Sequence, residues 1–378
     1  MRLKNSTNFG AHQRHLGRIG KSVIRNKGFN LHDFSGVRVL ITGHTGFKGA
    51  WLTRILNHAG AKVFGVALPP ESGSIYMRTP ELNFANQKFV DVSNRKKISK
   101  FIYKSAPDVI IHMAAQPLVR RSYREPVETF ETNVMGTAHI LDAALHLENL
   151  KGVVVVTTDK VYKNVEKSEG YIEAEALGGT DPYSASKSAA EMVINAWQNI
   201  AQSSTNIRIV AARSGNVIGG GDHAEDRLLP DLIRGFRKNE KVIIRNPQSL
   251  RPWQHVLDPL FGYLMIASRI LKHQTLSSAY NFGPRDDSKL TVSQMSDIAC
   301  QYWPNNRGWV HQSAGDILHE SNLLWLSSER ARRELGWTNH LDARESIKWS
   351  IDWELEAEKT STVKALDLDI ARYQEMIA

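Results

Sequence analysis

The sequence of 378 residues contains a single cysteine, Cys300. One cysteine excludes an internal disulfide and any metal site built from several thiolates. No pair of histidines has the HExxH spacing of a zinc-binding helix. No apolar run approaches the roughly 18 residues that a membrane-spanning helix needs. We therefore expect no bound metal and no membrane span, and we expect Cys300 to be a small buried apolar residue.

Acidic residues are absent from residues 1–30, which hold seven lysines and arginines. The formal net charge of the chain is +9, but the remaining residues carry 41 basic and 39 acidic side chains. A folded nucleic-acid binder would be expected to show a basic face, so this near-neutral body argues against one. The extension lacks the apolar core of a secretory signal and weakly resembles an organelle transit peptide. We favour the interpretation of a flexible basic extension.

Near-continuous apolar, β-branched runs alternate with helix-like segments through the first half of the chain. This alternation is typical of a parallel sheet that is covered by helices on both faces. We therefore predict an α/β fold with a Rossmann-type doubly wound parallel sheet. The runs are residues 37–42, 61–68, 87–92, 108–115, 152–158 and 207–214, and the helix-like segments include residues 49–60 and 136–150.

The alternation weakens after about residue 215, where prolines and tryptophans become frequent. We predict a dinucleotide-binding domain over residues 31–215, which also holds the catalytic residues. Residues 216–378 are expected to form mainly a smaller, partly discontinuous substrate-binding lobe. In doubly wound proteins, ligands bind at the carboxyl ends of the strands. A cleft between the two lobes would therefore hold the site.

A glycine-rich loop, ITGHTGFKG, follows the first apolar run and contains Gly43, Gly46 and Gly49. Its spacing is GxxGxxG, which is neither the P-loop pattern nor GxGxxG. The order of strand, glycine turn and helix still matches a dinucleotide site, where a helix N-terminus binds the pyrophosphate. The alternative is a purely structural glycine turn.

The acid that usually follows the second strand of an NAD site is missing. The strand ends at Leu68, and Pro69 comes next. The residues alone therefore do not decide between NAD and NADP. Asp91, at the end of the third run, is a candidate for the adenine amino group, or else a turn residue or helix cap.

Tyr183 and Lys187 lie in the segment DPYSASK. Asp181 is predicted to cap a helix and Pro182 to be its first residue. The two side chains then share one helix face, where an ammonium and the helix N-terminus favour a phenolate. Such a tyrosine is a general base near neutral pH. A surface pair is the alternative.

The strand VVVVTT ends in Thr158, Asp159 and Lys160. A parallel strand that exits here would present these side chains to the cleft. The alternative is a turn-forming aspartate followed by a solvated lysine. Taken together, the glycine loop, the strand-end threonine and the Tyr-xxx-Lys pair form the pattern of the extended short-chain dehydrogenases/reductases.

Within that superfamily the sequence resembles the CDP-glucose 4,6-dehydratases of the NAD-dependent epimerase/dehydratase family. The resemblance extends from about residue 30 to residue 355. It departs from the family pattern at His223, where the family has tryptophan, and in the N-terminal extension. The matching motifs are TGHTGFKG (42–49), HMAAQPLVR (112–120), TNVMGT (132–137), TDK (158–160), DPYSASK (181–187), GNVIGGGD (215–222), DRLLPD (226–231), RNPQSLRPWQHVLDPL (245–260), NFGPRD (281–286) and ELGW (334–337).

The resemblance implies an NAD-dependent lyase that dehydrates CDP-D-glucose to CDP-4-dehydro-6-deoxy-D-glucose. Tyr183, activated by Lys187, would take the proton of the sugar 4-hydroxyl, and Thr158 would bind the same oxygen. Lys160 would remove the proton on carbon 5, and protonated Asp159 would protonate the departing 6-hydroxyl. The cofactor-binding residues it implies are Gly43, Thr45, Gly46, Phe47, Lys48, Gly49, Asp91, Val92, Ala114, Ala115, Gln116, Asn133, Tyr183 and Lys187.

The substrate-binding residues are expected to be Asn216, Arg227, Leu228, Arg251 and Asn281, since guanidinium groups match diphosphate oxygens. Trp253 either stacks on the base or belongs to the core, and structural roles are favoured for His255 and His112. The resemblance also implies a cytoplasmic homodimer in deoxysugar biosynthesis, including that of lipopolysaccharide O-antigen. The alternatives are another nucleotide-sugar dehydratase, epimerase or reductase, or a cofactor-binding protein without catalysis.

Overall fold

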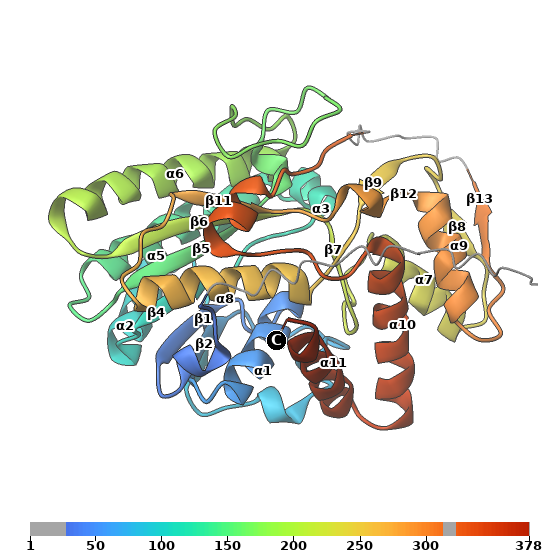
Figure 1. The fold of residues 1–378 in the computed structure, drawn as a ribbon, viewed down its shortest axis with the longest axis horizontal. Helices are drawn as coiled ribbons and strands as arrows, with labels where there is room; N and C mark the ends of the chain where they lie inside the picture. The colour runs from blue at the N-terminus through green and yellow to red at the C-terminus, as the bar shows by residue number, and fades with distance from the viewer. Residues whose placement is uncertain (1–27, 313–322, 378) are drawn as a thin grey trace, which may run out of the picture.

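A seven-stranded sheet forms the centre of the molecule (Figure 1). This computed structural model describes residues 28–312 and 323–377, so the predicted extension lies outside the described residues except for residues 28–30. Each pair of neighbouring strands is parallel, which confirms the predicted fold class. In sheet order the strands are β11 (Ala279–Phe282), β6 (Arg208–Ser214), β5 (Gly152–Thr158), β4 (Val109–His112), β1 (Arg38–Thr42), β2 (Lys62–Ala67) and β3 (Gln87–Phe89).

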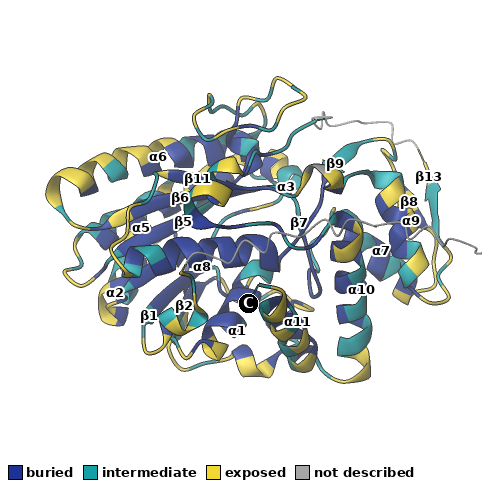
Figure 2. Ribbon diagram, in the orientation of Figure 1, coloured by how far each residue is buried: buried dark blue, intermediate teal, exposed yellow. Residues whose placement is uncertain are grey.

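Alternate residues of the central strands belong to two different hydrophobic cores. In β1, Val39 and Ile41 join one core and Leu40 joins the other. Each strand is therefore apolar on both faces, as a sheet between two helical layers requires. Figure 2 shows the strands as the most buried part of the chain. One layer contains α2 (Arg95–Ser105), α5 (Gly136–Leu145) and α6 (Pro182–Ser204), and the other contains α1 (Phe47–His58), α8 (Leu257–Leu271) and α11 (Thr362–Ile377).

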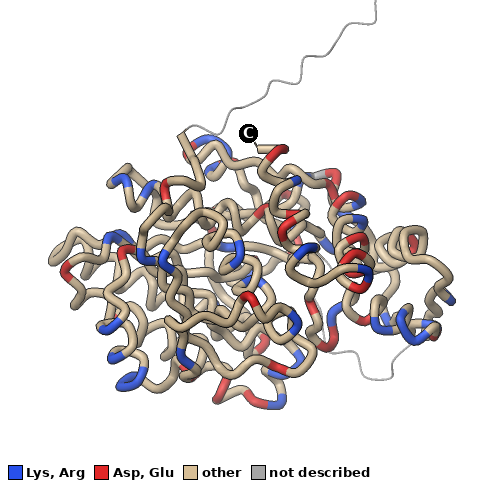
Figure 3. The backbone as a smooth tube through the Cα atoms, turned by 90° about the horizontal axis from the view of Figure 1, so that it is seen from below, with Lys and Arg blue, Asp and Glu red and all other residues tan. Residues whose placement is uncertain are grey.

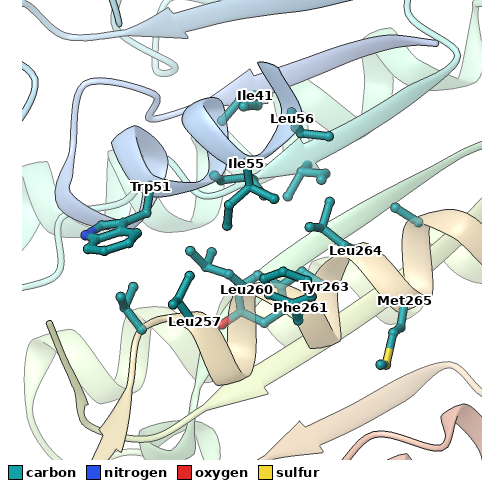
Figure 4. Packing of buried hydrophobic residues seen from close by; sticks show 14 of the residues in the cluster. Ile41, Trp51, Ile55, Leu56, Leu257, Leu260, Phe261, Tyr263, Leu264 and Met265 are labelled. Carbon is teal, nitrogen blue, oxygen red and sulfur yellow. The ribbon is translucent and has the colours of Figure 1, made fainter. Parts of the chain in front are cut away.

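Figure 4 shows the packing between α1, which follows the glycine loop, and α8. Trp51 and Ile55 of α1 face Leu257 and Leu260 of α8, and all four side chains are fully buried. Complete burial of such side chains contributes about 1.5–3 kcal/mol each. This contact therefore fixes α1, and with it the glycine loop, against the sheet.

The smaller lobe has a hydrophobic core of its own, formed by residues such as Leu232, Phe236, Met295 and Ile347. It lies beyond the carboxyl ends of the strands, at the right of Figure 1. Its elements are β7 (Val217–Ile218), α7 (Leu228–Arg237), β8 (Val242–Ile244), β9 (Leu250–Pro252), β10 (Gln254–His255), β12 (Lys289–Thr291), α9 (Val292–Tyr302), β13 (Trp309–His311) and α10 (Ala343–Lys359).

Part of the second half of the chain returns to the large domain. Strand β11 extends the main sheet, α8 covers it, and α11 packs against α1 and α10. The predicted runs did not include β11, because its four residues, AYNF, are too short to show a period. The observed β3 is shorter than the run predicted over residues 87–92, since the chain turns at Asp91.

Short helical segments connect the larger elements. No helix within the described residues is long and apolar enough to cross a membrane. Basic and acidic residues are mixed along most of the backbone in the view of Figure 3. The connecting segments are η1 (Leu31–Phe34), η2 (Pro80–Leu82), α3 (Val119–Arg124), α4 (Pro126–Phe130), η3 (Glu131–Met135), η4 (Asp159–Val161), η5 (Asp286–Ser288) and η6 (Ala331–Leu335).

Candidate active site

The glycine loop has the geometry of a dinucleotide site. Gly43 has φ +78°, and a Cβ there would lie 2.9 Å from the backbone nitrogen of Ala114. A Cβ on Gly49 would lie 2.1 Å from the Gly43 carbonyl oxygen. Gly46 is the N-cap of α1 and has no capping side chain, so the first N–H groups of the helix face the loop. The backbone can thus approach a pyrophosphate closely and bind it through N–H groups.

His44, inside the loop, does not face the cofactor side. Its ring is fully buried among Tyr76, Phe84 and Phe89, and its Nε2 lies 2.9 Å from Gln87 Oε1. Burial lowers the pKa of His44, so the ring is neutral near pH 7. His44 therefore acts as a packing residue behind the loop.

Lys48, predicted to bind the cofactor, reaches across the loop toward the end of β6. Its Nζ lies 2.9 Å from Ser214 Oγ and 3.3 Å from Tyr263 Oη. Burial, Arg227 and Lys187 lower its pKa to about 7. The structure thus places its amine near two other cations, Arg227 and Lys187.

A second part of the predicted cofactor site is an interlocked pair of amides. The backbone N–H of Gln116 donates to Asn133 Oδ1 at 2.8 Å, and Asn133 Nδ2 donates to the Gln116 carbonyl and to Ser186 Oγ. Both side chains are buried. They fix the segment that follows β4, including Ala114 and Ala115, against the helix of Tyr183.

Asp91 forms a turn at the end of β3. Its Oδ1 accepts the N–H of Ser93 at 2.8 Å, whereas the cap of α2 is Asn94. Val92 is buried against Gly136, where a Cβ would lie 2.6 Å from Val92 Cγ2. The interpretation of Asp91 as a helix cap is therefore wrong. Its carboxylate is partly exposed, and its contact with the adenine amino group stays a prediction.

Tyr183 and Lys187 occupy the first turns of α6 as their spacing predicts. Asp181 caps this helix by accepting the N–H of Ser184 at 3.0 Å, and Pro182 is its first residue. Both functional side chains are buried, so the interpretation as a surface pair is wrong. Burial lowers the pKa of Lys187 to about 8, and its Nζ donates to the Val156 carbonyl at 3.3 Å.

The strand end at Thr158, Asp159 and Lys160 lies beside Tyr183. The hydroxyl of Thr158 donates to Asp159 Oδ1 at 2.9 Å. Burial raises the pKa of Asp159, while Lys160, Thr158 and Arg251 lower it. A raised pKa keeps a proton on a carboxyl group nearer to neutral pH. The pocket here is lined by Asp159, Lys160, Asn216, Arg251, Pro252 and Leu324.

Arginines of the smaller lobe reach this centre. Arg227 Nη1 lies 2.9 Å from Asp222 Oδ2, and its charge acts on Tyr183. Leu228, the residue after it, begins α7. Asn281 is placed differently from its predicted role. It is fully buried, and its amide bonds to Tyr162 Oη and the Tyr171 carbonyl. This position does not favour a substrate contact.

The structural roles favoured for the two histidines agree with their positions. His112 is buried and lies between Thr42 and Thr137, and burial lowers its pKa to about 3. His255 is fully buried between the rings of Trp51 and Trp349. Trp253 is only 6% exposed and belongs to the core of the smaller lobe. This placement supports its interpretation as a core residue.

The sequence did not point to a buried ion pair behind the catalytic residues. Glu191 accepts two hydrogen bonds from Arg213, each 2.9 Å long. Glu191 lies one helical turn beyond Lys187, and this spacing is the only signal that could have drawn attention to it. Asp222 was also missed, although it lies five residues before Arg227.

Comparisons with known proteins identify the family of the chain. The model of the NAD dependent epimerase/dehydratase family matches residues 39–283. The chain belongs to this family. This membership confirms the predicted NAD cofactor, whose pyrophosphate fits the cradle at Gly43 and Gly49.

Several relatives of the chain are 4,6-dehydratases. A CDP-glucose 4,6-dehydratase of Salmonella typhimurium is 42% identical over 85% of this chain and 92% of that protein. A dTDP-glucose 4,6-dehydratase of Haemophilus influenzae is 25% identical over 84% of this chain and 98% of that one. The first of these relatives supports the predicted enzyme class, a nucleotide-sugar 4,6-dehydratase.

Solved structures of related fold confirm the architecture. An epimerase of Methanothermobacter thermautotrophicus matches with a TM-score of 0.74 and 23% identity over 87% of this chain and 95% of that chain. A UDP-glucose 4-epimerase of Thermotoga maritima matches with a TM-score of 0.72 and 18% identity over 85% and 99%. At these identities the matches show the fold alone.

Proposed function

We propose that this protein dehydrates CDP-glucose to CDP-4-dehydro-6-deoxyglucose. The observation that carries the proposal is that two sets of reactive side chains lie next to each other. Tyr183, Lys187 and Thr158 form an oxidation set, and Asp159 and Lys160 add an acid and a base directly beside it. An epimerase or reductase of the same family does not need this second set. The 42% identity to a CDP-glucose 4,6-dehydratase supports the same conclusion.

In the oxidation step, Tyr183 takes the proton of the 4-hydroxyl and Thr158 donates a hydrogen bond to the same oxygen. When bound, NAD+ would accept the hydride of carbon 4, and its reduced form would return the hydride to carbon 6 while carbon 5 regains a proton. Lys187 lies four residues after Tyr183 on α6, one helical turn away, and is proposed to supply positive charge to the phenol. A neighbouring cation favours the phenolate that this proton transfer requires.

In the elimination step, Lys160 removes the proton on carbon 5, which the 4-keto group has made acidic. The electron pair forms the bond between carbons 5 and 6, and the 6-hydroxyl leaves as water with the proton of Asp159. The buried Asp159 suits this role because burial favours its protonated form.

The cations of the smaller lobe favour a nucleotide diphosphate as the group attached to the sugar. Arg251 lines the pocket and Arg227 lies near Tyr183. Asp222 holds the Arg227 guanidinium in place. Arginine forms paired hydrogen bonds with phosphate oxygens, so these two residues are the proposed diphosphate ligands.

The proposed enzyme is a homodimer that pairs through α3, α4 and α6. Large apolar side chains are exposed on these helices: Tyr123, Val127 and Phe130, with Met192 and Ile200 on α6. Exposed apolar side chains gathered on neighbouring helices mark interaction sites in soluble proteins. Sedimentation equilibrium should give a dimer, and a monomer at micromolar concentration would reject this part of the proposal.

The test of the function is incubation with NAD+ and, separately, CDP-, UDP-, GDP- and dTDP-glucose. A 4-keto-6-deoxy sugar from CDP-glucose alone supports the proposal. A keto product formed only from another nucleotide sugar would support the proposed reaction but reject CDP-glucose as the substrate. Epimerised or reduced sugar in place of a 6-deoxy product would favour the sibling enzymes. The predicted cytoplasmic location and the role in O-antigen synthesis stay predictions.

A further inference from the structure

The turn that carries Asp159 and Lys160 is held on both sides by hydrogen bonds to buried groups. On one side, Thr157 Oγ1 donates to Glu191 Oε1 at 2.5 Å. On the other side, the hydroxyl of Ser188 donates to the Val161 carbonyl at 2.8 Å. Both Glu191 and Ser188 belong to α6, the helix of Tyr183 and Lys187. The two reactive sets are thus tied to one helix.

A second tie begins at Tyr162, the residue after the turn. Its hydroxyl accepts Arg213 Nη1 at 2.7 Å and donates to Asn281 Oδ1 at 2.8 Å. Arg213 pairs with Glu191 through two bonds of 2.9 Å each. One network therefore connects α6, β6, β11 and both ends of the catalytic turn.

This network is unusual in being charged and almost completely enclosed. The side chains of Arg213 and Glu191 are only 6% and 4% exposed. A buried ion pair contributes little net stability, because desolvation of the two charges offsets their attraction. The paired hydrogen bonds instead fix the orientation of the Arg213 guanidinium, because it must bind both carboxylate oxygens at once. The network is therefore better suited to aligning side chains than to stabilising the fold.

We propose that Tyr162, Arg213 and Glu191 are positioning residues that align Asp159 and Lys160 with the sugar oxidised by Tyr183; the proposal rests on the function proposed above. Tyr183 acts at carbon 4, while Asp159 and Lys160 act at carbons 6 and 5. All three must therefore face one bound sugar. A displacement of about 1 Å in such a group slows a reaction by roughly 100-fold. Loosening the turn should consequently slow elimination more than oxidation, because Tyr183 lies on α6 and only Thr158 of the oxidation set lies on the turn.

The test variant is Tyr162→Phe, which removes one hydroxyl and keeps the ring. In single turnovers with CDP-glucose, reduced nicotinamide should form and then accumulate, because elimination is slowed more than oxidation. Turnover should fall by about 10- to 100-fold with little change in KM. Tyr280→Phe is the matched control. Tyr280 is also fully buried, on β11, and its hydroxyl bonds to Glu334 at 2.9 Å, away from the turn. It should show no accumulation.

Equal slowing of both steps in Tyr162→Phe, or unchanged turnover, would overturn the proposal. A second measurement separates its failure from failure of the proposed function. Backbone amide exchange of residues 157–162 should be faster in Tyr162→Phe than in the wild type, and unchanged in Tyr280→Phe. If the wild type dehydrates no nucleotide sugar, the proposed function fails. Unchanged exchange in Tyr162→Phe would still reject the positioning role by itself.

Discussion

At the scale of residues, the reactivity of Tyr183 depends on its neighbours. Its pKa is raised to about 12, chiefly by burial and in part by the nearby Asp159. The hydrogen bond with Thr158 and the charge of Arg227 act in the opposite direction. The side chain therefore stays a neutral phenol, and it becomes a base only when a cation of the site or the cofactor stabilises the phenolate.

Tyr183→Phe should abolish oxidation at carbon 4, because no group then accepts the 4-hydroxyl proton. We expect a loss of about 10²- to 10⁴-fold in the rate of reduced nicotinamide formation, measured by absorbance after mixing with substrate. Tyr103→Phe, an exposed tyrosine on α2, is the control and should behave as wild type. Oxidation by Tyr183→Phe at the wild-type rate would remove Tyr183 from the mechanism.

Lys160→Ala should separate the two steps in the opposite way. Oxidation at carbon 4 should persist, while exchange of the carbon 5 hydrogen with solvent and overall turnover fall by roughly 10²- to 10⁴-fold. Isotope exchange monitored by NMR checks this prediction. The nearby exposed Lys163 provides the control Lys163→Ala, which should retain exchange. If the carbon 5 hydrogen of the sugar exchanges at the normal rate in Lys160→Ala, another residue must be the base.

The positions of these residues were predictable where the signal is local. Asp181, Pro182 and the four-residue spacing of Tyr183 and Lys187 define a helix start within one short segment, and the structure has that helix. The destination of Lys48 was not predictable, because its partner Ser214 lies 166 residues away along the chain. The structural partners of Asn281, Tyr162 and Tyr171, were likewise not predictable, because they lie more than a hundred residues away along the chain, and its role as a substrate ligand stays a prediction.

At the scale of elements, the C-terminal helix α11 is fastened to α8 by a buried carboxyl group. Tyr373 of α11 donates to Asp258 Oδ1 at 2.7 Å, and Asn339 donates to Asp258 Oδ2 at 2.8 Å. Burial raises the pKa of Asp258 to about 7. No local pattern indicates this contact, because Tyr373 lies 115 residues after Asp258.

This carboxyl group should make stability depend on pH. The folded pKa of Asp258 is about 7 and the unfolded pKa is about 3.9, so the folded state binds the proton more tightly. Stability contributed by Asp258 is therefore full at low pH and lost as the pH rises through about 7. Asp258→Asn should remove this part of the dependence.

Thermal unfolding of both forms from pH 5 to pH 8 checks the prediction. The difference in Tm between Asp258→Asn and wild type should move in favour of the variant as the pH rises. The amide has a partner available, because the buried Oδ1 of Asn339 has no hydrogen bond. Parallel Tm curves for the two proteins would contradict the assignment.

At the scale of the whole molecule, one glycine turn joins the two lobes. A Cβ on Gly220 would lie 2.1 Å from the ring of Trp353 on α10, and Trp51 of α1 donates to the Gly220 carbonyl at 3.0 Å. The next N–H, that of Gly221, donates to the buried carboxylate of Glu354 at 2.7 Å. The turn leads directly to Asp222 and thus to Arg227. The relative position of the lobes therefore determines where Arg227 lies.

Gly220→Ala should destabilise the protein, because the Trp353 ring must move. Inserting a methyl group into such packing costs about 1–3 kcal/mol in the free energy of unfolding. Gly46→Ala is the control, since its Cβ would make only an ordinary 3.4 Å contact. Urea unfolding of both variants measures the difference. Equal stability of Gly220→Ala and wild type would show that the lobes do not meet at this turn.

The central claim is that a hydride leaves carbon 4 and returns to carbon 6 of one sugar as water is lost. The most direct measurement uses CDP-glucose deuterated at carbon 4, in ordinary water, with the product analysed by mass spectrometry and NMR. We predict a product lighter by one water that keeps the deuterium, now at carbon 6. A product that has lost the deuterium, or that retains the mass of the substrate, would contradict the claim.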